Sequence, residues 1–299
     1  MGRGGVTAPG TILVVGDVID DVVVRPLRAP APDTDTPAEI TACPGGSGAN
    51  QAAWLGALGA DVRFAGRTGA RDAAGHAAAL RASGVDARLA ADPAAPTGQI
   101  VVLVRDGRRD MFTSRGANLN LTAADLPDTL LDGVALLHVS GYSLFHDGVR
   151  AAVTGLMARA RRRGVALSVD PASAGFLRDT GAARFRTWTA PARLIFPNLA
   201  EGRLLTGART PDGVADALTA AYDVVALKLG ADGALVATAD GTRLRLPPAP
   251  ARVADPTGSG DAFCAGYLTA WISGAPPRAC GDSALAAAAR ALATIGARP

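Results

Sequence analysis

The chain carries the segment Ala254-Asp255-Pro256-Thr257-Gly258-Ser259-Gly260-Asp261-Ala262-Phe263, which leads from a predicted strand and loop into an apolar helix expected to run to about Ile272. Small residues let the backbone approach a ligand closely, and the free N–H groups at the start of a helix attract anions. Gly258, Ser259 and Gly260 are therefore candidates for an anion hole that suits a phosphate.

Asp261 follows this anion hole in the first turn of the predicted helix. An acidic residue is ordinary there, because it complements the helix dipole. It is also placed to accept a hydroxyl proton while the hydroxyl oxygen attacks phosphorus. The segment alone supports both interpretations equally, and Asp261 is the candidate general base of a phosphoryl transfer.

Two better-known phosphate-binding patterns do not fit the chain. The P-loop pattern G-x-x-x-x-G-K-[ST] needs a lysine, and the only lysine, Lys228, is not part of such a pattern. The Rossmann pattern needs a third glycine, but Phe263 and Gln51 stand at those places after Gly258-x-Gly260 and Gly46-x-Gly48. A phosphate cradle would be of another type, and a NAD enzyme is disfavoured.

A second informative segment is Cys43-Pro44-Gly45-Gly46-Ser47-Gly48-Ala49-Asn50-Gln51-Ala52. Its proline and paired glycines lead tightly into a predicted helix whose first turn carries Ser47 and Asn50. Glycine lets a polyol come near the backbone, and Asn50 can both donate and accept hydrogen bonds. Taken alone, the segment is explained more simply as a helix N-terminus capped by Ser47.

Short apolar runs rich in β-branched residues alternate with alanine-rich stretches of helical period. This βαβα pattern predicts a mostly parallel sheet with helices on both faces. The expected strands are 11–15, 62–64, 134–139, 165–169, 194–196 and 224–229, and the expected helices include 47–58 and 146–163.

Two stretches interrupt the pattern. Residues 21–43 begin with alternating valines and end in a loop rich in proline, aspartate and threonine, and residues 99–114 read as two strands joined by an Asp106-Gly107 turn. Both are expected to add antiparallel pieces to the parallel core. They form either edge strands of the sheet or a small β-sheet lid, about residues 22–43 and 99–114, that excludes water from a reaction.

The composition excludes several classes of protein. The 299 residues are 48% hydrophobic and 19% charged, enough apolar residue for a sizeable core. Arginines are scattered despite the net charge of +3, so nucleic-acid binding is not expected. The three cysteines and three histidines show no zinc or disulfide pattern. No apolar run approaches a membrane span or a signal-peptide core, so a cytoplasmic protein without a membrane partner is expected.

Together the two glycine-rich segments resemble the two signatures of the ribokinase-like, or PfkB-type, carbohydrate kinase family. Residues 16–21, 197–201 and 228–233 resemble further motifs of the family in the expected order. The resemblance covers nearly the whole chain. It implies a three-layer α/β/α fold with a mostly parallel sheet and a small β-sheet lid, in a single kinase domain over residues 1–299.

The resemblance also implies roles for individual residues. Asp261 would be the general base beside the anion hole, and Asp21, Gly46 and Asn50 would bind substrate hydroxyls.

On the nucleotide side, Lys228 and Gly230 would lie near ATP, although Lys228 could also be a surface lysine at a strand end. Asn198 and Glu201 would hold hydrated Mg²⁺, which keeps several waters and uses substrate phosphates as ligands. Asp255 and Thr257 would lie near a monovalent-cation site, with K⁺ as the candidate ion.

Departures from the family pattern bear on the substrate. Ser47 stands where close ribokinases usually carry lysine, and residues 137–141 lack the carboxylate with which ribokinases hold the sugar. Phosphoryl transfer remains the expected reaction, while ribose is disfavoured. We expect an ATP-dependent kinase of a sugar or sugar acid. The alternative is a nucleoside kinase of adenosine or pseudouridine type, with Phe112, Tyr142 and Phe145 as candidates for stacking a base. A non-catalytic nucleotide-binding regulator is less favoured, because it would not need Asp261.

The predicted lid suggests an assembly. Its strands would present unpaired backbone edges and alternating apolar residues such as Val22, Val24, Val102 and Val104. Exposed edges of this kind invite pairing. We therefore expect a homodimer joined through two lids, as the family resemblance also implies.

Overall fold

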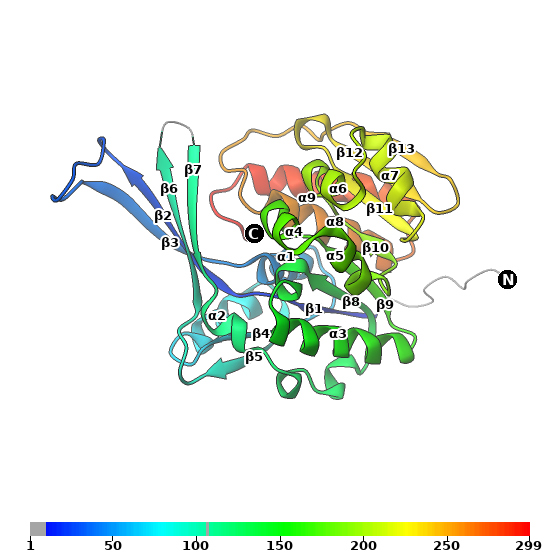
Figure 1. The fold of residues 1–299 in the computed structure, drawn as a ribbon, viewed down its shortest axis with the longest axis horizontal. Helices are drawn as coiled ribbons and strands as arrows, with labels where there is room; N and C mark the ends of the chain where they lie inside the picture. The colour runs from blue at the N-terminus through cyan, green and yellow to red at the C-terminus, as the bar shows by residue number, and fades with distance from the viewer. Residues whose placement is uncertain (1–9, 106–107) are drawn as a thin grey trace.

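A computed structural model describes residues 10–105 and 108–299 of the chain. Within these ranges the main sheet has nine strands, in the order β13-β12-β11-β10-β9-β8-β1-β4-β5 (Figure 1). The strands are β1 (Thr11–Val15), β4 (Val62–Gly69), β5 (Val85–Asp92), β8 (Val134–Ser140), β9 (Ala166–Asp170), β10 (Leu194–Ile195), β11 (Val224–Lys228), β12 (Ala234–Thr238) and β13 (Arg243–Leu246). Neighbours pair in parallel from β5 to β11 and antiparallel beyond, so the predicted mostly parallel sheet is confirmed.

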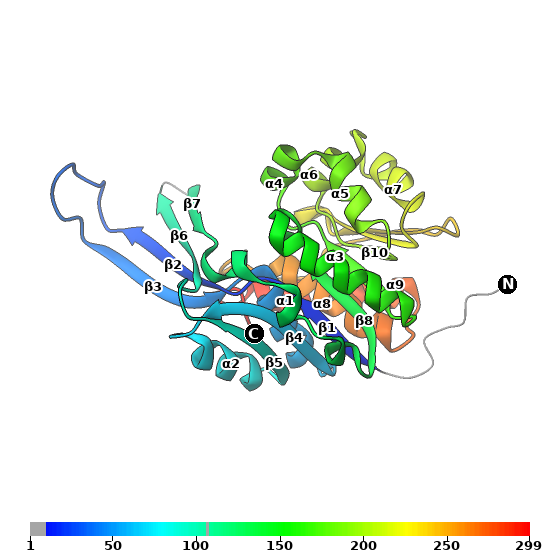
Figure 2. The same ribbon diagram turned by 60° about the horizontal axis from the view of Figure 1, so that its bottom comes forward.

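Helices cover both faces of this sheet, because successive side chains of a strand point to opposite sides. In β1, Ile12 and Val14 belong to one hydrophobic core and Leu13 and Val15 to the other. The three-layer α/β/α arrangement predicted from the sequence is therefore present (Figure 2). One face is covered by α1 (Ser47–Ala57), α2 (Ala73–Ala82), α8 (Ser259–Ile272) and α9 (Pro277–Leu292), and the other by α3 (Asp147–Arg162), α4 (Ala174–Thr180), α5 (Ala182–Thr189), α6 (Leu199–Thr206) and α7 (Pro211–Thr219).

Short 3₁₀ helices complete the connections between these elements. The 3₁₀ helices are η1 (Gly116–Asn120), η2 (Ala123–Asp125), η3 (Asp128–Leu131), η4 (Gly141–Leu144) and η5 (Gly230–Asp232).

In the part of the chain that the structure describes, no helix combines the length and the apolar character needed to cross a bilayer.

A second sheet, of four strands among the described residues, stands apart from the main one. Its strands are β2 (Ile19–Pro26), β3 (Ala38–Gly45), β6 (Gly98–Arg105) and β7 (Arg108–Ser114), in the order β3-β2-β6-β7. The two antiparallel hairpins join through a parallel β2–β6 pair, and the sheet projects from the body of the molecule (Figure 1). The predicted Asp106-Gly107 turn lies outside the described residues. The stretches predicted as a lid thus form a separate sheet and not edge strands of the main one.

The register of the lid places the four valines named in the sequence prediction on two different faces. Val24 pairs with Leu103, which lies between Val102 and Val104 in β6. Because successive residues in a strand point to opposite faces, Val22 and Val24 face away from Val102 and Val104. The lid therefore has two apolar faces, one toward the body of the molecule and one turned outward.

Candidate active site

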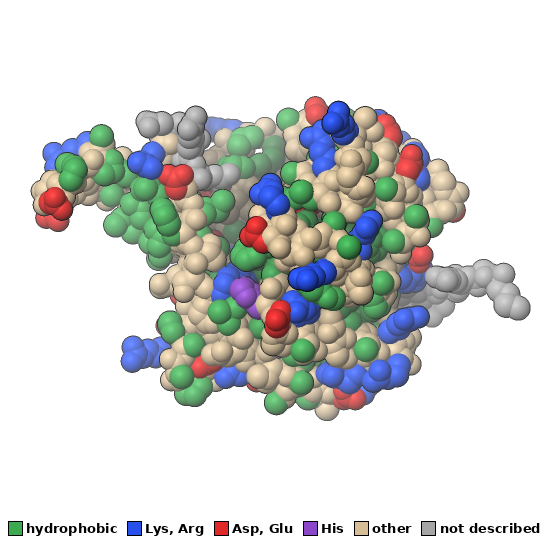
Figure 3. All heavy atoms as spheres, viewed as in Figure 1, with side chains coloured by type: hydrophobic (Ala, Val, Ile, Leu, Met, Phe, Trp, Pro, Cys, Tyr) green, Lys and Arg blue, Asp and Glu red, His purple; other side chains and the backbone are tan. Residues whose placement is uncertain are grey.

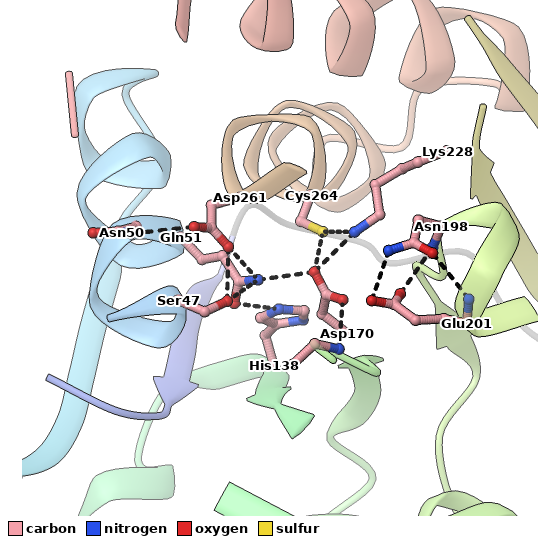
Figure 4. Close-up of polar contacts among 11 residues, drawn as sticks. Ser47, Asn50, Gln51, His138, Asp170, Asn198, Glu201, Lys228, Asp261 and Cys264 are labelled. Atoms are coloured by element: carbon pink, nitrogen blue, oxygen red, sulfur yellow. Dashed lines mark hydrogen bonds and ion pairs between the residues drawn. The ribbon is translucent and has the colours of Figure 1, made fainter. Parts of the chain in front are cut away.

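The start of α8 meets the start of α1 beyond the carboxyl ends of the parallel strands, where open α/β sheets bind ligands. Asp261 is the third residue of α8. Its Oδ1 accepts hydrogen bonds from Ser47 Oγ at 2.7 Å and Gln51 Nε2 at 3.1 Å, and its Oδ2 accepts from Asn50 Nδ2 at 3.2 Å (Figure 4). The three donors share one side of α1, because residues three and four apart are neighbours on a helix. They converge on a single carboxyl group.

Burial, the largest influence, raises the pKa of Asp261 to about 7. The Asp170 carboxylate adds to this rise, while the hydrogen bonds from Ser47 and Asn50 and the charge of Lys228 oppose it. A group that titrates near neutral pH can take a proton from a reacting hydroxyl and release it again. The environment of Asp261 therefore suits the predicted base.

The predicted anion hole lies at the N-terminus of α8. Gly258 is the N-cap residue and adopts a left-handed φ of 76°, where a Cβ would lie 2.4 Å from the Ala297 carbonyl oxygen. Only glycine fits this position. The Ser259 hydroxyl donates to the Pro256 carbonyl oxygen at 2.9 Å, which fixes the turn before the helix. The backbone at the helix start is thereby held close to any ligand beside Asp261.

Asp170, at the end of β9, joins the base to the predicted nucleotide side. Its Oδ2 lies 3.1 Å from Lys228 Nζ, 3.0 Å from Gln51 Nε2 and 3.1 Å from Cys264 Sγ. The Lys228 side chain is only 15% exposed, so the alternative of a surface lysine is wrong. Burial alone would lower the pKa of Lys228. Electrostatic interaction with Asp170, and then with Cys264 and Glu201, raises it by more, so the ammonium stays charged. Its Nζ lies 3.7 Å from where a Cβ on Gly260 would be, which places a cation beside the anion hole.

The predicted magnesium residues, Asn198 and Glu201, form a helix cap. Asn198 Oδ1 accepts from the Glu201 N–H at 2.9 Å, and Glu201 accepts from the Asn198 N–H at 2.9 Å and from its Nδ2 at 2.7 Å. This is a capping box at the start of α6. Burial raises the pKa of Glu201 to about 7, against the charge of Lys228.

The capping box stands next to Lys228, since Asn198 and Lys228 form a β-bridge. Among the described residues no group of three or more His, Cys, Asp or Glu side chains gathers to ligate a metal. One carboxylate close to a phosphate site fits Mg²⁺, which retains waters and takes phosphate oxygens as ligands.

A cavity of about 200 Å³ opens between Asp261 and the lid, and the three predicted substrate residues line it. Asp21 Oδ1 is buried and has no hydrogen-bond partner among the described residues. Burial, and then the charge of Asp17, raise the pKa of Asp21 to about 6. Gly46 adopts a φ of 89° with no room for a Cβ, which would lie 2.6 Å from the Asp17 carbonyl oxygen. With Asn50 beside them, these groups can bind substrate hydroxyls.

The lid side of the cavity is largely aliphatic, with Asp21 and Arg25 as its charged residues. Of the three aromatic residues considered for stacking a base, Tyr142 lines the cavity. Phe112 is 61% exposed and pairs with Val101, on the outward face of the lid, and Phe145 stacks on Phe176 instead. Hydrophobic side chains gather over the lid in Figure 3. The lid residues that line the cavity include Val23, Ile100, Val102, Val104 and Met111.

The remaining predicted residues lie in the loop before α8 and in η5. Asp255 Oδ1 accepts from Thr257 N–H at 2.9 Å and from its hydroxyl at 2.6 Å, and Oδ2 accepts from Gly296 N–H at 3.2 Å. These bonds hold the loop before α8 at the cavity wall. Gly230 is exposed in η5, whereas Lys228 points inward, so the two predicted nucleotide residues face different surroundings.

Sequence reasoning missed several members of the site. Asp170 belongs to none of the matching motifs, and Gln51 stands out only as a misfit to the Rossmann pattern. The signals were present, because Asp170 ends a buried strand and Gln51 lies one helical turn beyond Ser47. The fully buried His138, which contacts Gln51, gave no such signal.

Comparisons with known proteins agree with this architecture. The chain is 30% identical over 288 residues to the protein named Bifunctional protein HldE from Shewanella sp. (strain MR-4), covering 90% of this chain and 57% of that protein. It therefore spans little more than half the length of that relative.

Two solved structures share the fold. Adenosine kinase from Sinorhizobium meliloti superposes with a TM-score of 0.87 at 22% identity, covering 98% of this chain and 96% of that one. A putative Ribokinase II from E. coli in complex with ATP and Mg²⁺ gives 0.84 at 22% identity, covering 96% and 94%. Residues 10–299 match the model of the pfkB family carbohydrate kinases, so the chain belongs to the PfkB family.

Proposed function

We propose that the chain is an ATP-dependent kinase that transfers the γ-phosphoryl group of ATP to a hydroxyl of a sugar or sugar acid. The observation that carries the proposal is Asp261, a carboxyl of near-neutral pKa that lies between an anion hole and a cavity lined by Asp21 and Asn50. Family membership supports a phosphotransferase, and the related fold solved with ATP and Mg²⁺ supports both ligands.

In this mechanism Asp261 takes the proton of the substrate hydroxyl as its oxygen bonds to phosphorus and the bond to ADP breaks. Asp21 and Asn50 orient the substrate, and Lys228 and the backbone of residues 258–260 face the charge of the moving phosphoryl group. Magnesium bound with ATP neutralises phosphate charge, and Asn198 and Glu201 would hold it through water. K⁺, if used, would lie near Asp255 and Thr257.

A nucleoside kinase is the second candidate. The observation that favours it is the aliphatic lid face, since a base could lie against Val23, Val102 and Met111 with Tyr142 beside it. The similarity in fold to an adenosine kinase also supports this second candidate. A non-catalytic regulator remains less favoured, because three donors converge on Asp261, which a binding protein would not need.

We also propose that residues 1–299 act in the cytoplasm as one kinase domain whose lid closes over the substrate and pairs with a second copy. The outward lid face exposes apolar side chains, among them Ile40 at 66% and Phe112 at 61%. Sedimentation at micromolar concentration tests the dimer, and Phe112→Ser should shift it toward monomer. Hydrogen exchange tests the lid, which should be protected by substrate more than β9.

The experiment that tests the proposed function is a two-stage screen. Sugars, sugar acids and nucleosides are tested with an ATP analogue for a rise in melting temperature, since a ligand that binds the folded state stabilises it. Each hit is then tested with ATP and Mg²⁺ for ADP formation. We expect at least one polyol to give both signals. A ligand that binds beside the analogue but never yields ADP would favour the regulator.

A further inference from the structure

Two amide side chains bind Asp261, and both present nitrogen to it. Asn50 Nδ2 lies 3.2 Å from Oδ2, and Gln51 Nε2 lies 3.1 Å from Oδ1. An amide turned by 180° has nearly the same shape, but its carbonyl oxygen, an acceptor, would then face the carboxylate. Two acceptors in contact repel each other. The carboxylate therefore favours the nitrogen-facing orientation, and a partner on the other side of each amide can fix that orientation further.

His138 selects the orientation of Gln51. Its Nε2 lies 3.0 Å from Gln51 Oε1 (Figure 4). Its Nδ1 lies 2.8 Å from Ser168 Oγ. Because an amide oxygen only accepts, His138 carries its proton on Nε2 and the Ser168 hydroxyl donates to Nδ1. Burial lowers the pKa of His138 to about 4, so the ring holds a single proton at neutral pH. The donors thus run in one direction, from Ser168 through His138 and Gln51 to Asp261.

The reverse orientation of Gln51 would be unfavourable twice over. Gln51 Nε2 lies within hydrogen-bond distance of two carboxylates, Asp170 Oδ2 at 3.0 Å and Asp261 Oδ1 at 3.1 Å. A turned amide would place its oxygen between these two acceptors and its nitrogen against a donor. His138 is fully buried, so water cannot replace it as the partner of Gln51 Oε1.

Arg298 does the same for Asn50 from another part of the chain. Its Nε donates to Asn50 Oδ1 at 3.1 Å, and its Nη2 donates to the Gly45 carbonyl oxygen at 2.7 Å. A guanidinium group has donors and no acceptor. Asn50 must therefore turn its oxygen to Arg298, which leaves its nitrogen for Asp261.

We propose that His138 and Arg298 are positioning residues that hold the Gln51 and Asn50 amides with their nitrogens toward Asp261. His138 acts through the Gln51 amide on Oδ1 of Asp261. Arg298 acts through the Asn50 amide on Oδ2. The inference rests on the proposed role of Asp261 as the base. It adds to that role two residues that neither the glycine motifs nor the cavity reveal.

The measurable consequence is a change in the acidity of Asp261. Hydrogen bonds to a carboxylate favour its charged form. If one amide is free to turn, Asp261 loses a donor and its pKa rises by about one unit. The other ionisable groups around it, among the described residues, are Asp170, Lys228 and Cys264 beyond Gln51, Tyr142 across the cavity and Arg298 behind Asn50. Substitution of His138 leaves all of them in place.

The test is a ¹³C NMR titration of the Asp261 carboxyl in the full chain labelled with ¹³C-aspartate, with Asp261→Asn identifying the signal. His138→Phe removes the ring nitrogens at similar volume and should raise the pKa of Asp261 by about one unit. His138→Gln, whose amide can donate near the Nε2 position, should restore most of the original value. The matched control is His76→Phe, a second buried histidine that pairs with Asp20, which should leave Asp261 unchanged.

Arg298→Met should likewise raise the pKa of Asp261, and Arg298→Lys should return part of the shift. If His138→Phe does not fold, Ser168→Ala replaces it, because it keeps His138 and frees its tautomer. If only the His138 variants or only the Arg298 variants shift the pKa of Asp261, the positioning role belongs to that residue and is refuted for the other. Unchanged titration in both arms would overturn the proposal. The pKa of Asp261 is measured without any phosphoryl transfer. Full turnover by Asp261→Asn would therefore refute the role of Asp261 as the base and leave the positioning proposal unaffected.

Discussion

The starts of α8 and α6 place the same kind of residue in the same position with opposite results. Each helix has an acidic residue at its third position, Asp261 in α8 and Glu201 in α6. In α6 the N-cap residue is Asn198, whose side chain and backbone both hydrogen-bond to Glu201. The Glu201 carboxylate therefore bonds to the N-cap of its own helix. In α8 the N-cap residue is Gly258, which has no side chain, and Asp261 bonds to α1 instead.

The difference shows how one helix-start acid is satisfied by its own cap while another bonds to a different helix. An acidic residue in the first turn complements the helix dipole in both cases. Asn198 satisfies Glu201 locally, whereas Gly258 leaves both oxygens of Asp261 to donors from a remote helix. The residue before the helix, and not the acid, separates the two outcomes.

The largest effect should come from removing the acid of α8. Asp261→Asn should lower kcat by roughly 10²–10⁴-fold, the usual loss for a positioned acid–base group, while ATP binding stays near normal. Turnover on the substrate found by screening and ATP affinity by calorimetry provide the measurements. Turnover close to the wild type in a folded variant would reduce Asp261 to a dipole partner like any other.

Giving α8 a side chain at its N-cap should be the next most damaging change. Gly258→Ala combines a left-handed φ of 76° with a Cβ 2.4 Å from the Ala297 carbonyl oxygen. The expected loss of unfolding free energy is roughly 2–4 kcal/mol, from backbone strain plus overpacking. Gly274→Ala is the matched control, with a φ of 79° and nothing within 4 Å, and should lose only roughly 1–2 kcal/mol. Equal losses by urea unfolding would rule out the clash.

Changing the acid of α6 should affect the metal and leave the base intact. Glu201→Gln keeps oxygen and nitrogen groups that can cap the helix but removes the charge near the phosphate site. The Mg²⁺ concentration for half-maximal rate should rise roughly tenfold, the scale of losing an outer-shell partner. An unchanged Mg²⁺ titration would leave Glu201 as a capping residue only.

The smallest effect is on stability against pH, and it should be shared by both acids. Their pKa values are raised to about 7, so the folded state binds more protons than the unfolded state between about pH 4 and 7. Each carboxyl therefore lowers the unfolding free energy as pH rises from about 4 to 7. Asp261→Asn and Glu201→Gln should each gain on the order of 1 kcal/mol over the wild type between pH 6 and pH 8. Parallel urea-unfolding curves across that range would contradict the titration of these groups.

Much of the fold was readable in the sequence, because strand and helix periods are local. The strand of residues 11–15, the helix that starts at Ser47 and the position of Asp261 at the start of α8 all agree with prediction. Contacts that depend on register across several strands were not readable. Lys228 reaches Asp170 because β9 and β11 flank β10 and both strands end at the same edge of the sheet. The two faces of the lid likewise depend on a one-residue register that composition does not encode.

The contact between α1 and α8 also determines when the surroundings of Asp261 can form during synthesis. It joins residues far apart in the chain, 214 positions for Ser47 and Asp261, and Trp54 is held to the Ala297 carbonyl oxygen across 243 positions. A ribosome adds about 5–20 residues each second, and domains fold as their parts become available. The surroundings that set the acidity of Asp261 therefore form only after α8 and the residues up to Arg298 have been synthesised. If Asp261 is the base, as proposed, the proton acceptor cannot form earlier in synthesis.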